Sequence, residues 1–122
     1  MNRTTKFEAL NNLRANAAGM SDYQHAFILA QDAAHRAGEI GFGNSPGMNA
    51  VAVARRASLI AALAKRVPAD QRAQVRALAV KYLGVARSAR RRAIAKDAES
   101  YRVAVSCYRR DLSNYWPHGA TA

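Results

Sequence analysis

The stretch from residue 46 to residue 67 places the strongest constraint on the fold, because its apolar residues cover most of a helix circumference. Ser45 and Pro46 suit an N-cap and a first helical position, and Pro68 stops the helix. The polar arc is narrow and holds Arg55, Ser58, Lys65 and Arg66. The wide apolar arc includes Ala52, Val53, Leu59, Ile60, Leu63 and Val67. A helix of this kind is buried among other helices, so we expect it to be the central helix of an all-α bundle.

Further helices are predicted on both sides of this central one. Residues 5–8, Thr-Lys-Phe-Glu, fit a capping box that opens a helix ending near Gly19. Residues 21–24, Ser-Asp-Tyr-Gln, fit a second capping box. It opens a helix that is expected to end at Gly38. Two more helices are expected, over about 69–83 and about 86–114, with a break at Gly84. No segment shows β alternation, so the sequence predicts a compact bundle of about five helices, one domain over residues 1–122.

The positive charge of the chain is confined to its second part. The net charge is +11, yet residues 1–50 hold four basic and four acidic residues, whereas residues 51–122 hold fifteen basic and four acidic. Such asymmetry favours a surface that binds an acidic partner, and the alternative is a solubilising coat. The single cysteine, Cys107, rules out a disulfide within the chain, and a cytoplasmic location is expected.

The candidate partner-binding residues cluster at the start of the last predicted helix. They are Arg87, Arg90, Arg91, Arg92 and Lys96, extended by Arg102, Arg109 and Arg110. Arginine suits phosphate and carboxylate because its planar guanidinium donates hydrogen bonds in pairs. On a straight helix, Arg90 and Asp97 fall near the centre of the apolar arc, and we expect Arg90 to face a partner or solvent.

Three other residues join this set. Residues 58–80 give two helices around a short turn with Pro68, as in helix-turn-helix proteins but without the usual turn glycine, and the second helix offers Arg72 and Arg76. Trp116, near the C-terminus, is an interface anchor or a cap on the bundle.

No residue pattern indicates catalysis, a cofactor or a metal. The eight carboxylates form no acid–base pair, and Cys107 is expected as a small residue at the edge of the core. His25, Asp32 and His35 share a helix face, and we interpret them as its polar outer side rather than as metal ligands. The glycine-rich loop 38–47 is interpreted as a connector that packs Ile40 or Phe42 on the bundle, with anion binding as the alternative.

Two functions remain open at this point. The first is a small nucleic-acid-binding accessory or regulatory protein of bacterial, phage or plasmid type, in which the basic residues contact DNA or RNA. The alternative is a protein-binding inhibitor or adaptor, for example a phage-encoded inhibitor of a host nucleic-acid-processing or defence complex, whose basic face covers an acidic surface. A homodimer is a further option, and neither an enzyme nor membrane binding is expected.

Overall fold

Three helices make up the described part of the chain. The computed structural model describes residues 20–110, and the side chains of residues 20–107. In this part α2 (Asp22–Gly41), α3 (Pro46–Ala64) and α4 (Ala69–Arg110) pack together, and no strand is present. The all-α class is confirmed. The prediction of five helices is wrong in this part of the chain, because no break separates residues 69–83 from residues 86–96, and α4 is interrupted only at Asp97. The helix predicted over 5–19 lies outside the described residues.

Helix α2 begins at the predicted capping box. The Ser21 hydroxyl accepts a hydrogen bond from the Gln24 amide at 3.1 Å, and the Gln24 side chain accepts one from the Ser21 amide at 3.0 Å. The helix continues through Gly38 to Gly41, beyond the predicted end. A glycine inside a helix costs only about 1 kcal/mol, which burial of Ala37 and Ile40 on either side of Gly38 outweighs.

Helix α3 is the most deeply buried of the three. Twelve of its 19 residues are buried, and its large apolar side chains make the core with Ile40 and Val67. Pro46 occupies the predicted first position, but Ser45 lies at φ 39° and ψ 59°, and its hydroxyl forms no cap hydrogen bond. The helix ends at Ala64 rather than Val67, although Val67 remains in the core. Alanines from all three helices fill the spaces between the larger side chains and allow close approach.

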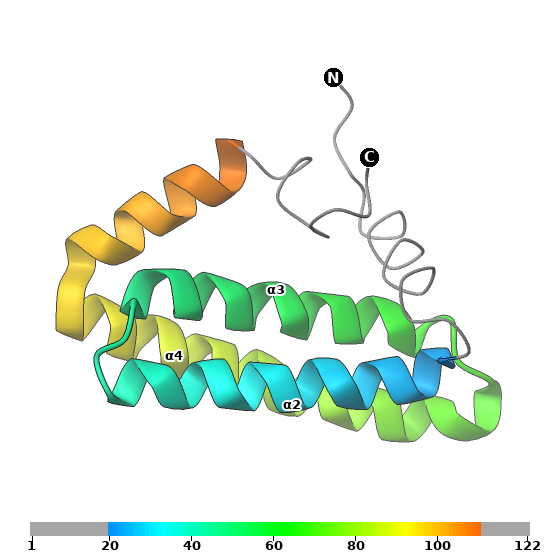
Figure 1. Ribbon diagram of the computed structural model, residues 1–122. Helices are drawn as coiled ribbons and strands as arrows, with labels where there is room; N and C mark the ends of the chain where they lie inside the picture. The colour runs from blue at the N-terminus through cyan, green and yellow to red at the C-terminus, as the bar shows by residue number, and fades with distance from the viewer. Residues whose placement is uncertain (1–19, 111–122) are drawn as a thin grey trace.

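Helix α4 runs the length of the α2–α3 pair and then bends back over the start of α3 (Figure 1). The predicted break at Gly84 is wrong, since the helix passes through that residue without interruption. The bend lies at Asp97, whose φ of −163° and ψ of 89° are not helical. Its carboxylate accepts a hydrogen bond from the Ser100 amide at 3.0 Å, so Asp97 caps the segment that follows. On a straight helix the Asp97 carboxylate would lie in the apolar arc. At the bend it is exposed to solvent instead.

A close contact between backbones lies just beyond this bend. The Gly47 amide donates to the Ser100 hydroxyl at 3.3 Å. A Cβ atom on Gly47 would lie 2.3 Å from the Ser100 carbonyl oxygen and 2.7 Å from the Tyr101 nitrogen, so only glycine fits. The start of α3 therefore holds the segment after Asp97 against the bundle. None of the helices in residues 20–110 is long and apolar enough to span a membrane.

Candidate functional site

Helix α4 has one buried side and one strongly basic side. Before the bend, its buried residues face α2 and α3 and are Val75, Ala79, Tyr82, Ala86, Ala89 and Ala93. Residues 71–96 contain eight lysines and arginines and no aspartate or glutamate. Seven of the eight side chains are exposed, and we call them the basic face: Arg76, Lys81, Arg87, Arg90, Arg91, Arg92 and Lys96. The core-facing residues thus orient a concentrated positive charge outward.

No carboxylate within residues 20–107 forms an ion pair with the basic face. Ion pairs between residues of this part of the chain involve other arginines: Arg36, Arg56, Arg66 and Arg102. Arg90 lies over the ring of Tyr101, 5.9 Å from its centroid, and Lys81 lies 5.5 Å from that of Tyr82. These ring contacts leave the positive charges in place and exposed. The structure therefore places six of the predicted residues on the basic face: Arg76, Arg87, Arg90, Arg91, Arg92 and Lys96.

The other predicted residues lie elsewhere. Arg72 is half-buried and donates to the Val67 carbonyl at 3.2 Å, so it holds the turn between α3 and α4. Arg102 follows the bend and pairs with Glu99, whose hydrogen bond and negative charge raise the pKa of Arg102. On a straight helix the eleven-residue spacing would place Arg102 on the same side as Arg91, but the bend at Asp97 breaks that register. Arg109 and Arg110 lie in the last turn of α4, and their side chains are outside the described part of the structure. Trp116 lies entirely outside the described residues.

The periodicity of the last predicted helix places Ala93 and Ile94 together on its apolar face, and the structure separates them. Ala93 is buried, as that pattern predicts, whereas the Ile94 side chain is 39% exposed. The reason is that α4 turns its buried stripe toward α2 and α3 along Ala86, Ala89 and Ala93. Arg90 is exposed, as expected.

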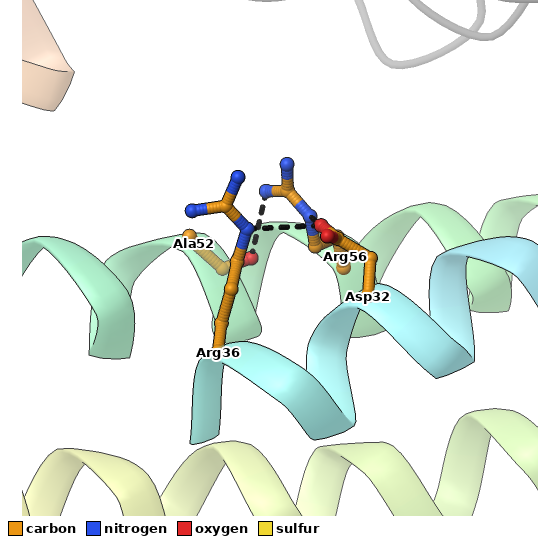
Figure 2. Close-up of polar contacts among 4 residues, drawn as sticks. All are labelled: Asp32, Arg36, Ala52 and Arg56. Carbon is orange, nitrogen blue, oxygen red and sulfur yellow. Dashed lines mark hydrogen bonds and ion pairs between the residues drawn. The ribbon is translucent and has the colours of Figure 1, made fainter. Parts of the chain in front are cut away.

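A second charged cluster joins α2 to α3 and involves Asp32, Arg36 and Arg56 (Figure 2). Arg36 donates to the Asp32 carboxylate at 2.9 Å from one turn along α2, and Arg56 donates to the same oxygen from α3. Arg56 also donates to the Ala52 carbonyl at 3.2 Å and is buried. Partial burial of Asp32 opposes its ionisation, but the hydrogen bonds and charges of both arginines prevail and lower its pKa.

This cluster is structural, and the sequence interpretation missed it. Asp32 was expected beside His25 and His35 on a polar outer side, but His25 is buried and only His35 is exposed. In residues 20–107 no three histidine, cysteine, aspartate or glutamate side chains lie together as a metal site would require. The adjacent Arg55 and Arg56 inside an otherwise apolar helix were the available signal, because a buried arginine needs a carboxylate partner.

Either Ile40 or Phe42 of the connector was expected to pack on the bundle, and Ile40 does so. Ile40 is fully buried, which confirms its predicted packing, whereas Phe42 is 81% exposed. Phe42 follows the last residue of α2 and precedes Gly43 at φ 79°, so the turn directs it away from the core. Cys107 is half-buried.

The replacement Asp32→Asn is expected to lower the free energy of unfolding by about 2 kcal/mol at pH 7, since it leaves the buried Arg56 guanidinium without its carboxylate. Because the folded-state pKa of Asp32 is lowered from 3.8, this stabilisation is present above pH 3.8 and is lost as the pH falls below it. Urea unfolding at pH 7 and pH 3 measures both effects. The control Glu99→Gln breaks a fully exposed pair and is expected to leave the free energy of unfolding nearly unchanged. Equal losses from the two variants would show that burial of Arg56 does not strengthen its pair.

Comparisons of this chain with protein-family models, with curated proteins and with solved structures found no match. What the basic face can bind must therefore follow from its own chemistry.

Proposed function

We propose that this protein binds nucleic acid through the basic face of α4, as a small accessory or regulatory protein. One observation carries the proposal: residues 71–96 hold eight basic residues and no acidic residue. Seven of the eight basic side chains are exposed. Ordinary exposed helices mix the two signs of charge, so a face of one sign is suited to a polyanion.

The form of the helix suits a phosphate backbone. From Arg76 to Lys96, α4 is regular, and at 1.5 Å per residue it extends about 30 Å. Its cations therefore meet several successive phosphates, which recur about every 3.4 Å along one strand. Five of the seven are arginines, whose guanidinium groups bind phosphate oxygens in pairs. Because the helix is fixed on the bundle, little backbone order has to be gained on binding.

Binding to a fluorescein-labelled 20-base-pair DNA, measured by anisotropy at several salt concentrations, tests this proposal. If about six of the seven cations contact phosphates, the logarithm of the affinity falls with the logarithm of salt at a slope of about −5. The double variant Arg87→Gln/Arg91→Gln is expected to weaken binding and to flatten that slope by about 2.

The matched control also removes two exposed positive charges, but outside the basic face. It is Lys65→Gln/Arg102→Gln, at the end of α3 and beyond the bend of α4. Its salt slope is expected to equal that of the wild type. An absence of binding at 50 mM salt, or equal effects of the two double variants, would contradict the proposal.

A protein-binding inhibitor or adaptor is the second candidate, and one observation favours it. Val80 is 70% exposed on α4, and Leu83 and Ile94 are each 39% exposed. Apolar side chains beside arginines are typical of protein interfaces. A pull-down from nuclease-treated host lysate separates the candidates, because a protein partner survives that treatment. If a protein partner is retained in this pull-down only when Val80 and Leu83 are intact, and the protein has no affinity for DNA or RNA, the second proposal would replace the first.

A further inference from the structure

Six of the seven cations of the basic face, all except Arg90, form two rows along α4. Arg76, Arg87 and Arg91 make the first row, and Lys81, Arg92 and Lys96 make the second. Each row contains one interval of eleven residues, which is three helical turns, and one of four residues, which is one turn. At 100° per residue the rows are about 140° apart around the helix. All six side chains are exposed, so the rows flank the part of α4 that points away from the bundle.

The strip between the rows is made of small residues. Ala77, Gly84 and Ala95 lie there and are exposed. A Cβ atom on Gly84 would meet nothing within 4 Å, so the space beyond the helix backbone is open. Cations on both sides of a low strip let the backbone itself come close to an anionic partner.

Aromatic side chains that would stack on unpaired bases are missing from this part of α4. Tyr82 is buried, and Tyr101, beyond the bend, is half-buried beneath Arg90. In residues 20–107 the exposed aromatic side chains are Phe27 on α2 and Phe42 in the turn after it. Proteins that bind single strands combine a positive groove with stacked aromatic side chains, and the basic face has only the charge.

Given the proposed function, on which this inference rests, we infer that the ligand is duplex DNA and that α4 enters its major groove. A helix with its side chains is about 10–12 Å across, and the groove of B-form DNA is about 12 Å wide. The small strip faces the floor of the groove, and the two rows reach the phosphates of the two strands. The major groove of duplex RNA is too narrow for this geometry. Because its contacts are to phosphates, the protein binds with little dependence on base sequence.

The test places bulk on the small strip without changing the charge. Three labelled probes are compared: a 20-base-pair DNA, one of its strands alone, and an RNA duplex of the same sequence. The wild type is expected to bind the DNA duplex about tenfold more tightly than either other probe. Gly84→Leu/Ala95→Leu is expected to weaken duplex DNA binding by about tenfold and to change single-strand binding by less than about twofold.

The control makes the same two replacements on α2. Gly38→Leu/Ala34→Leu changes exposed helical positions, and a Cβ atom on Gly38 also meets nothing within 4 Å. This control should leave all three affinities unchanged, and circular dichroism verifies that both variants keep their helices, as leucine favours a helix more than glycine does.

Each outcome has a defined meaning. Equal affinity for strand and duplex, preference for RNA, or equal weakening of strand and duplex binding by Gly84→Leu/Ala95→Leu would overturn the groove inference and leave the proposed function standing. Failure of all three probes to bind would overturn both. Tenfold selectivity for the DNA duplex that only the α4 variant removes would establish the groove inference.

Discussion

The variant in which Arg87, Arg91, Arg92 and Lys96 are all replaced by glutamine is expected to bind duplex DNA about 1000-fold more weakly than the wild type. Each exposed contact to phosphate is worth about 1 kcal/mol at moderate salt, and about 1.4 kcal/mol corresponds to a factor of ten. The four residues come from both rows, so neither strand of the duplex keeps its full set of contacts. Arg90 is retained because it also packs over Tyr101. Anisotropy titration at 100 mM salt measures the loss.

A control with the same change in net charge separates local from overall electrostatics. Replacing Gln24, Gln31, Ala34 and His35 by glutamate adds four negative charges at exposed positions of α2 and leaves the basic face intact. Glutamate at position 24 still serves the capping box. Since salt screens exposed charges beyond about 10 Å, this control should lose less than about tenfold in affinity. Equal losses in the two variants would mean that net charge alone, rather than the basic face, attracts the DNA.

The local parts of the fold could be predicted from the sequence. The capping box at Ser21 and the apolar circumference of residues 46–67 depend on neighbours within one or two turns, and both give helices in the structure. Gly84 was misleading, because its helix cost of about 1 kcal/mol is small beside the burial of Tyr82 and Ala86 around it. The bend at Asp97 was not predicted: an aspartate that can cap a helix is visible in the sequence, but the close approach of Gly47, fifty residues away along the chain, is not.

The candidate site divides in the same way. The run from Arg87 to Lys96 is visible in the sequence because a helix keeps neighbouring residues together. Arg102 was predicted to belong to the partner-binding set, and its pairing with Glu99 was missed, although residues three apart can face each other on a helix. The partner of Arg56 was not predictable, because Asp32 lies on another helix and is brought to it only by packing. The direction of the two rows likewise depends on which side of α4 the core covers.

The replacement Gly47→Ala is expected to lower the free energy of unfolding by about 3 kcal/mol, even though alanine favours a helix by about 1 kcal/mol over glycine. The new methyl group would meet the Ser100 carbonyl oxygen at 2.3 Å, and backbone atoms cannot turn aside as a flexible side chain can. Either α3 moves outward or the segment after Asp97 leaves the bundle. Denaturant unfolding measures the change, and Gly38→Ala, at an open helical position, should instead stabilise the protein slightly.

The same variant separates the bend from the basic face. Arg76 to Lys96 precede Asp97 and are held by the buried side of α4, so loss of the contact at Gly47 leaves both rows of cations in place. We therefore expect Gly47→Ala to keep its affinity for duplex DNA to within about twofold at temperatures where it remains folded. If its stability equals that of the wild type, the backbone contact does not hold the bend. If its affinity instead falls with its stability, the segment after Asp97 belongs to the binding surface, and the interface extends beyond the basic face.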